Sequence, residues 1–501
     1  MLREASLGLA GVVIIAYVIE FLVSHLDDPR EPRRVPPRIP VIGHILGFLR
    51  HGFDYYNLAS QNTDAEIYTV GIMNLKVYVT HATRLTHMIQ RSKTLSFGPF
   101  LQLSSKVHGN VSDEAHALFN GDLLEDFSLR TREALAPGPH LDAQNLRMAD
   151  QSLIEVTDML KQGEIQLLEW ARHAVVQATG AGLYGVQHPF KDPEIEDAMW
   201  IWDEHRPGHM IGIDPLGKGY NARAKVFETF REYFQNMPDD VSLIIRQRQK
   251  ILRDGGICEE DAYKMQSTLS DAAYPNTVPT LFWTVYEIYS RPELLEAIRQ
   301  EIFSKAVRKS DEGFILDVAA LKTECHILLS AYQETQRTRH SQVAFRMVVE
   351  DTLLDGQYLL KKGNYLHMPA KPIHENPKIW GPQASVFDPY RFVPAVAGES
   401  RAKILPSSFL PWGAPPHMCP ARQFASTEIL IITALLALRV NLTPASAKGW
   451  EREPAVKSMD IPTLPRPRKD VRLKVTAREE GAGIWAIIIG ESKTRVSLAS
   501  G

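Results

Sequence analysis

The amino-acid sequence predicts a mainly α-helical protein with a minor β part, preceded by a single N-terminal transmembrane helix. Three patterns lead to this fold class: an apolar run at residues 7–23, helical periodicity over most of 147–345 and again over 420–440, and short strand-like segments within 67–82 and 346–368. With 501 residues, 44% of them hydrophobic, the chain is long enough to bury a large core. Its net charge of −3 gives no indication of a nucleic-acid partner.

The apolar run LGLAGVVIIAYVIEFLV at residues 7–23 carries one charge, Glu20, near its end. A helix rises about 1.5 Å per residue, so roughly 17 to 20 residues just cross a hydrocarbon core of ~30 Å. Arginines cluster at residues 30–38 after the run, whereas Arg3 alone precedes it, which places the rest of the chain in the cytosol. We therefore expect residues 1–26 to form a membrane anchor. One alternative is a cleaved signal peptide, but no small-residue cleavage site follows the run. The other is a buried core helix, but such a helix is not normally followed by a proline-rich segment such as VPPRIPVIG.

Prolines separate the anchor from the body. Pro36, Pro37 and Pro40 disfavour helix, so residues 27–46 are predicted to form a stiff, extended hinge. Residues 47–501 show no internal repeat and no second apolar span of comparable length, and they are predicted to form one catalytic domain.

Within this body the composition predicts several irregular segments. Residues 97–145 are expected to be loop-rich with a break at PGPHLD, and a turn is expected at Asp355-Gly356. A proline-rich coil is expected over 369–416, followed by a helix that begins at about residue 420.

The chain has three cysteines and no CxxC motif, which argues against a disulfide framework. Cys258 and Cys325 lie in ordinary surroundings, whereas Cys419 lies in FLPWGAPPHMCPARQFASTEIL, where a loop meets a helix and Pro420 suits the first helical turn. The N–H groups at a helix start stabilise a thiolate, and such a thiolate is a suitable axial ligand for haem iron. The alternative is a buried structural cysteine.

The segment around Cys419 resembles the haem loop of the cytochromes P-450, written F-x-x-G-x-[R/H]-x-C-x-G. His417 matches the basic residue of this motif. Three positions depart from it, since Trp412 stands for the phenylalanine, Pro415 for the first glycine and Ala421 for the last.

The family's other motifs occur in the expected order. Glu334 and Arg337 form an E-x-x-R pair one helical turn apart, and Arg391 follows in FDPYRF. The resemblance implies that Arg391 binds this pair and braces the haem core. The same four-residue spacing also begins at Glu31, Glu169, Glu228 and Glu296, where solvated surface pairs are expected, so order along the chain singles out Glu334.

The resemblance also implies the cofactor and the partners. The cofactor would be haem b, with Cys419 as the axial ligand of its iron, Trp412 beside it, and Arg346, His374 and His417 as partners of the propionates. The family's upstream Trp-x-x-x-Arg pair is not identified in this sequence, so the propionate contact from that side stays unassigned. An electron donor, NADPH–cytochrome P-450 reductase, is expected because the chain has no flavin or nicotinamide fingerprint. The expected location is the endoplasmic reticulum membrane. Residues 464–501 are expected to extend beyond the usual end of the family's fold.

The central helix departs from most of the family, which carries an acidic residue followed by threonine to deliver protons to oxygen. Here Pro275 takes the acid's place and Asn276 the threonine's, with Thr277 next. The proline removes an N–H and is expected to kink the helix and open backbone carbonyls above the haem. The pattern NTVPTLFW resembles the branch of sterol 7-alpha-hydroxylases and prostacyclin synthase. Asn276 and Thr277 are therefore candidate catalytic residues that hold a proton-delivering water; the alternative is that they only pack the helix.

The predicted function is that of a haem-thiolate monooxygenase, which inserts oxygen from O2 into a lipophilic small molecule of sterol, terpenoid or polyketide type in specialised or lipid metabolism. Candidate substrate-contacting segments are 97–124, 199–220 and 272–280, which are rich in apolar residues. Two alternatives remain: a haem-thiolate isomerase or dehydratase that needs neither O2 nor reductase, and a membrane-tethered helical binding protein without enzymatic activity.

Overall fold

The computed structural model describes residues 17–18, 21–22, 24–72, 75–394, 405–414, 417–457, 460–490 and 492–500. Most of the predicted membrane anchor, residues 1–26, lies outside these ranges. In the part of the chain that is described, no helix combines the length and apolar character that crossing a membrane requires.

Helices make up most of the described chain, as predicted. In chain order they are α2 (Gly43–His51), α3 (Tyr55–Ser60), α4 (Thr83–Arg91), α5 (Gly98–Val107), α6 (Asp113–Leu118), α7 (Gly121–Ala134), α8 (Pro139–Met159), α9 (Leu167–Tyr184), α10 (Pro193–Met210), α11 (Lys218–Gln235), α12 (Leu243–Asp254), α13 (Glu259–Tyr289), α14 (Pro292–Lys305), α15 (Val318–Thr323), α16 (His326–Arg339), α17 (Ala370–His374), α18 (Pro377–Trp380) and α20 (Arg422–Arg439). Short 3-10 turns lie at Gly52–Asp54, Pro189–Lys191, Pro406–Ser408 and Glu479–Gly481.

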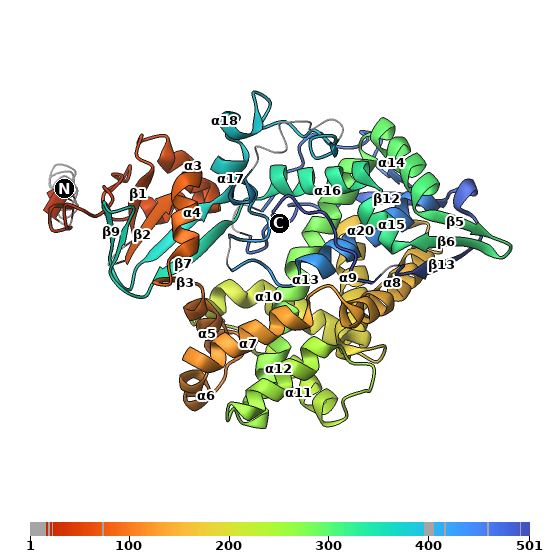
Figure 1. Ribbon diagram of the computed structural model, residues 1–501, viewed down its shortest axis with the longest axis horizontal. Coiled ribbons are helices and arrows are strands. Elements are labelled where there is room, and N and C mark those ends of the chain that lie inside the picture. Colours follow the sequence, from red (N-terminus) through yellow and green to blue (C-terminus); the bar gives the residue numbers. More distant parts are fainter. Residues whose placement is uncertain are drawn as a thin grey trace, which may run out of the picture.

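The strands form the minor part of the fold. They are β1 (Ile67–Ile72), β2 (Leu75–Thr80), β3 (Leu95–Ser96), β4 (Glu164–Gln166), β5 (Val307–Ser310), β6 (Gly313–Asp317), β7 (Val343–Val348), β8 (Thr352–Leu354), β9 (Tyr358–Leu360), β10 (Tyr365–Pro369), β11 (Val440–Pro444), β12 (Arg472–Ala477) and β13 (Ile484–Ile488). The largest sheet has the order β1-β2-β10-β7-β3, with β10 parallel to β2 and antiparallel to β7. In Figure 1 this sheet lies toward the N-terminal end, beside the helical body.

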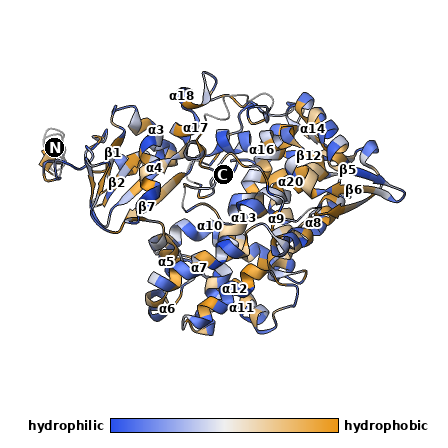
Figure 2. Cartoon of the chain, viewed as in Figure 1, coloured by the Kyte–Doolittle hydropathy of each residue, from blue (hydrophilic) through white to orange (hydrophobic). Residues whose placement is uncertain are grey.

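The helical body is built around α13 and α20. Nearly every side chain of α20 after its first turn is buried, because the helix is enclosed by other elements. Residues 429–438 of this helix are almost all apolar, and Figure 2 shows hydrophobic colours in this part of the body. Two of the buried polar groups in this core are paired: the indole nitrogen of Trp283 donates to the carbonyl of Pro465 at 2.8 Å, and the Tyr332 hydroxyl pairs with Ser426 at 3.0 Å.

The proline at position 275 does not end α13, which runs without a break through Pro275 and Pro279. Pro275 has no N–H, so the carbonyl of Asp271 lacks its usual helical donor. The guanidinium of Arg206 on α10 donates to that carbonyl at 3.4 Å. The carbonyl that the proline releases is therefore bound by a neighbouring helix, which differs from the expectation that it would open above the haem.

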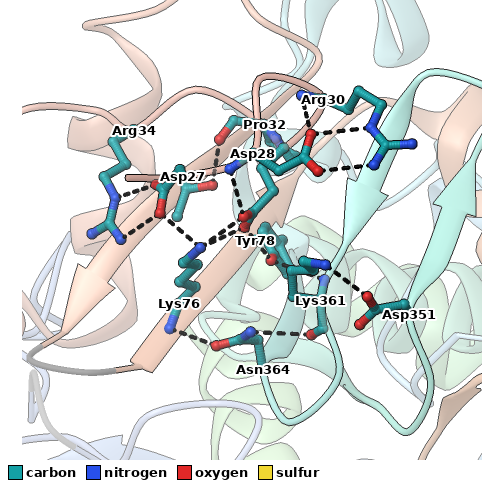
Figure 3. Close-up of polar contacts among 12 residues, drawn as sticks. Asp27, Asp28, Arg30, Pro32, Arg34, Lys76, Tyr78, Asp351, Lys361 and Asn364 are labelled. Carbon is teal, nitrogen blue, oxygen red and sulfur yellow. Dashed lines mark hydrogen bonds and ion pairs between the residues drawn. The ribbon is translucent and has the colours of Figure 1, made fainter. Parts of the chain in front are cut away.

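The N-terminal part of the predicted hinge is bound to the large sheet (Figure 3). The backbone of Val35 donates to Thr69 on β1 at 3.0 Å. The ammonium of Lys76 on β2 binds Asp27 and Glu31, each at 2.7 Å, and the hydroxyl of Tyr78 donates to Glu31 at 2.8 Å. Because the Glu31 side chain is almost fully buried, these contacts hold residues 27–35 against the sheet.

Two predictions about irregular segments are wrong. Residues 97–145 contain α5, α6, α7 and the start of α8, and side chains cap two of these helices: Ser112 accepts from the N–H of Ala115, and Asn120 from that of Gly121. The helices are short and bury few positions each, so their periodicity is weak. Residues 464–501 do not run past the fold, since β12 and β13 each pair with other strands.

Other local predictions are confirmed. Asp355 and Gly356 both have positive φ, 54° and 68°, as a tight turn between antiparallel strands requires, and they connect β8 to β9. The coil expected over 369–416 is mostly irregular in its described part, although it includes the short helices α17 and α18.

Candidate functional site

A cavity lies between α13 on one side and α20 with the preceding loop on the other. Cys419 and Trp412 line it from the loop, and Asn276 and Thr277 line it from α13. Most of the remaining wall is apolar and comes from α7, α9, α12, α13 and α20: Leu135, Leu183, Ile244, Leu269, Ala273 and Phe424. The structure thus brings together four residues that the sequence analysis had selected from positions as far apart as 276 and 419.

The loop that carries Cys419 closes on itself. The backbone N–H of Cys419 donates to the carbonyl of Trp412 at 2.9 Å, and Gly413 adopts a φ of 81°, which residues other than glycine rarely adopt. Helix α20 begins at Arg422, so Cys419 lies three residues before the helix and Pro420 precedes the first turn. The expected position of Pro420 inside that turn is therefore wrong by two residues.

The thiol of Cys419 borders the cavity but is otherwise enclosed by protein. Burial raises its pKa above the usual value, and the N–H of Ala421 together with the charge of Arg422 opposes this shift. The groups at the start of α20 therefore do not lower the pKa of Cys419 enough to offset the effect of burial. A metal ion bound to the sulfur would do so, because the charge of the metal deprotonates a coordinating thiol.

The two residues on α13 have fixed hydrogen bonds. The side-chain oxygen of Asn276 accepts the backbone N–H of Thr463 at 3.0 Å, which leaves the NH2 group of the amide as its free donor. The hydroxyl of Thr277 donates to the carbonyl of Ala273 at 2.8 Å and so retains its lone pairs as acceptors. Because both side chains line the cavity, one donor and one acceptor are available there.

The pair Glu334 and Arg337 on α16 is fully buried. The guanidinium of Arg337 donates to both carboxylate oxygens of Glu334, at 2.7 and 2.8 Å, and the Nε of Arg391 donates to the same carboxylate at 3.1 Å. Arg337 also donates to the carbonyl of His374, and Arg391 to that of Trp380. One buried carboxylate therefore joins α16 to α17, to α18 and to the segment that contains Arg391.

Three of the other four E-x-x-R sequences, at Glu169, Glu228 and Glu296, form surface pairs. Glu169 and Arg172 are 3.7 Å apart, Glu296 and Arg299 are 3.9 Å apart, and each glutamate side chain is more than half exposed. Glu31 does not form the expected surface pair, because it is buried and binds Lys76, while Arg34 binds Asp27. Glu334 differs from all four because it is buried together with the arginine of its own motif, which sequence spacing does not reveal.

Comparison with known proteins agrees with this geometry. A family model described as Cytochrome P450 matches residues 222–465. The cytochrome P450 monooxygenase nodJ of Hypoxylon pulicicidum is 31% identical to this chain, over 86% of this chain and 87% of that protein. The chain belongs to the cytochrome P450 family. It is accordingly an oxidoreductase of the monooxygenase type, whose family implies a haem cofactor, O2, a small-molecule substrate and a redox partner.

Two further similarities extend the comparison. The human 7-alpha-hydroxycholest-4-en-3-one 12-alpha-hydroxylase is 28% identical to this P450, over 87% of this chain and 91% of that protein. The solved structure of a retinoic acid-bound cyanobacterial protein, CYP120A1, superimposes with a TM-score of 0.70 at 18% identity, covering 89% of this chain and all of the other. The latter similarity shows the shared fold.

The residues of this P450 around the cavity fit haem, which carries two propionates. Arg346 is 2% exposed, its guanidinium donates to the carbonyls of Phe345 and Ala414, and burial lowers its pKa to about 10. A buried cation of this kind is stabilised by a nearby anion. His417 lies close to Arg346, and burial together with the charges of Arg346 and Arg132 lowers the pKa of His417 to about 4. The protein's own surroundings therefore favour the neutral imidazole at His417.

His374 does not join this group, because its ring is bound elsewhere in the protein. Its Nδ1 donates to the carbonyl of Arg337 at 3.1 Å, and its Nε2 accepts the N–H of Leu410 at 3.0 Å. Both ring nitrogens are thus used inside the protein, and burial lowers the pKa of His374 well below its usual value. The structure corrects the predicted propionate contact: His374 connects the buried ion pair to the loop before Cys419.

Two residues of the site were missed by sequence analysis. Arg132 on α7 borders a cleft together with His417 and provides a cation where the family's Trp-x-x-x-Arg pair had been left unassigned. Arg132 was missed because residues 97–145 were predicted to be loop. Glu428 on α20 is fully buried, lines the cavity and accepts the hydroxyl of Thr179 at 2.7 Å. The sequence did contain an indication of Glu428, because it is an acidic residue within an otherwise mostly apolar helical segment.

We expect Glu334→Gln to lower the free energy of unfolding by about 3–5 kcal/mol, because it leaves Arg337 buried without a full counter-charge. It should also lower the haem content, measured as the ratio of haem to protein absorbance. Glu296→Gln is the matched control, since it removes an exposed glutamate of the same motif, and should cost less than about 1 kcal/mol. Equal losses in the two variants would contradict the bracing role of Glu334.

Burial raises the pKa of Glu428 to about 8, so the folded protein favours its protonated form. A glutamate in the unfolded chain titrates near ~4.3, so between these pH values the folded state binds more protons and stability falls as pH rises. We expect this group to contribute a slope of up to about 1.4 kcal/mol per pH unit between about pH 5 and 8. Glu428→Gln should remove this slope in denaturant unfolding; parallel pH profiles for the two proteins would contradict it.

Proposed function

We propose that this cytochrome P450 is a haem-thiolate monooxygenase that inserts oxygen from O2 into a lipophilic small molecule of sterol, terpenoid or polyketide type, in specialised or lipid metabolism. The observation that carries the proposal is the thiol of Cys419 at one wall of an apolar cavity whose opposite wall presents Asn276 and Thr277. The haem would be held by the Cys419 thiolate and, at its propionates, by Arg346, Arg132 and His417. When bound, it supplies oxygen activation at its iron.

The apolar wall of the cavity supports a lipophilic substrate. Burying apolar surface against side chains such as Leu135, Leu183 and Ile244 is favourable, and the few polar groups then fix orientation. Relatives point the same way, because one is a fungal monooxygenase and another is named as a hydroxylase of a sterol-type ketone.

In this proposal Asn276 and Thr277 replace the acid and alcohol found in most of the family. The amide NH2 of Asn276 donates, the hydroxyl of Thr277 accepts, and together they hold a water molecule at the cavity surface that passes protons inward. Thr463 keeps Asn276 in the required orientation through its backbone N–H.

The proposal includes a membrane location and an external electron source. Residues 1–26 would anchor the protein in the endoplasmic reticulum membrane with its body in the cytosol, and residues 27–46 would connect the two. Electrons would come from NADPH–cytochrome P450 reductase, because the sequence has no fingerprint for a flavin or nicotinamide of its own. The anchor's length and the flanking arginines support this arrangement.

A second candidate is a haem-thiolate isomerase or dehydratase that uses neither O2 nor a reductase. Pro275 at the acid's position favours it, because no carboxyl remains there to deliver protons. Turnover of a peroxide substrate without reductase and without oxygen would select this candidate over the monooxygenase.

We expect the reduced carbon monoxide complex of the wild-type protein to show the absorption characteristic of thiolate-ligated haem. Cys419→Ser should lose that absorption, because a hydroxyl does not replace a thiolate as the axial ligand. Cys258→Ser is the matched control, since Cys258 is exposed and caps the start of α13, and it should leave the spectrum unchanged. Thiolate absorption in Cys419→Ser would overturn the assignment.

We expect Asn276→Leu to reduce the amount of product formed per NADPH consumed by about 10-fold or more and to increase peroxide release, because it removes the donor that holds the water. The variant keeps a side chain of similar size, so substrate binding spectra should change little. Unchanged coupling in Asn276→Leu would assign Asn276 to helix packing instead.

A further inference from the structure

The last described residues, 492–500, form a C-terminal strap across α16 and α20, close to where Figure 1 marks the C-terminus. Gln423 on α20 binds the backbone of Val496 twice, accepting its N–H at 2.7 Å and donating to its carbonyl at 3.1 Å. Gln333 on α16 accepts the N–H of Ala499 at 2.7 Å. Since Val496 and Leu498 are buried, the strap is part of the folded body.

A pocket of about 170 Å³ lies between the strap, the end of α15 and the start of α16. Three basic side chains line it: Lys322 from α15, His326 from α16 and Arg495 from the strap. Hydroxyl groups of Thr323 and Ser497 border it as well, and its described lining contains no aspartate or glutamate. The pocket is therefore electropositive and rich in hydrogen-bond donors.

Lys322 is the unusual member of this pocket. The residue is 4% exposed, and among the described residues its ammonium group has no hydrogen bond and no ion pair. Burial lowers the pKa of Lys322 to about 8, and the more distant charge of Asp142 opposes this shift. An ammonium largely withdrawn from water without a partner is destabilising, so an anion in the pocket would stabilise the folded protein.

Two carboxylates near the pocket are already engaged. Asp142 accepts the hydroxyl of Ser492 at 2.6 Å, and Glu301 accepts the N–H groups of Ile327 and Leu328 at the start of α16. Neither of them supplies the missing counter-charge for Lys322 directly.

We propose that this pocket binds a phosphate-type oxyanion, with Lys322 as the buried anchor and His326, Arg495 and Ser497 as further donors. Several donors converge on a space larger than one water molecule needs, and a tetrahedral oxyanion offers enough acceptors for them. The volume accommodates the phosphate group and leaves any attached organic part outside.

Binding has a consequence for the strap. The anion joins Arg495 on the strap to Lys322 and His326 on the body, so it holds the strap in place. The strap in turn binds Gln423, four residues after Cys419, and thereby stabilises the first turn of α20. Occupancy of the pocket therefore stabilises the folded protein through a site separate from the cavity.

The test is thermal unfolding of the full-length, haem-loaded protein during titration with inorganic phosphate at constant ionic strength, with chloride as the balancing anion. At a concentration 100 times the Kd, a bound ligand lowers the unfolding equilibrium constant about 100-fold, so Tm should rise with phosphate. Lys322→Met should lose this rise and, without phosphate, be at least as stable as wild type because the unpaired charge is gone. Lys448→Met, which removes an exposed lysine, is the matched control and should respond as wild type does.

Arg495→Gln provides a second variant that leaves the buried part of the pocket intact, and it should weaken phosphate binding about 10-fold. Glycerol phosphate and vesicles containing phosphatidic acid distinguish the source: a rise in Tm with the former indicates a soluble phosphate ester, and a rise with vesicles alone indicates a lipid headgroup. The proposal is overturned if Tm does not respond to any of these probes, if Lys322→Met responds as wild type does, or if Lys322→Met is strongly destabilised without phosphate.

Discussion

The buried carboxylate of Glu334 is the interaction on which the rest of this structure depends. A carboxylate with no exposed surface is tolerated only when positive groups and donors surround it. Arg337 and Arg391 supply them, and each arginine also donates to backbone carbonyls of other segments. Through His374, which binds both Arg337 and Leu410, the same cluster extends to the loop that carries Cys419. The position of the thiol is therefore set from a distance by an ion pair that never contacts the cavity.

The cavity itself follows from how its polar wall groups are satisfied. Asn276, Thr277 and Glu428 each have a partner within the wall, on Thr463, Ala273 and Thr179 respectively. Because these contacts fix each group, the cavity keeps an apolar lining with a few oriented polar atoms. The proline on α13 fits this pattern, since the carbonyl it releases is bound by Arg206 on the side of α10.

The C-terminal strap adds a constraint on the other side of α20. It binds the first turn of α20 through Gln423 and binds α16 through Gln333. Helix α20 follows the Cys419 loop, and α16 carries the buried pair Glu334 and Arg337. Cofactor loop, ion pair and strap therefore share the same two helices, and a change in one is transmitted by rigid packing to the others.

The sequence by itself determined the mainly helical fold class, the strands near residues 67–82, the turn at Asp355-Gly356 and the choice of Cys419, Glu334 and Arg391, because local periodicity, turn chemistry and the order of motifs are written along the chain. Only the tertiary structure decided that His374 braces the loop, that Arg132 approaches His417, that Glu428 lines the cavity and that the tail after residue 464 pairs into the sheets. The physical reason is burial: a side chain's partners and its pKa depend on segments hundreds of residues away, which spacing alone does not encode.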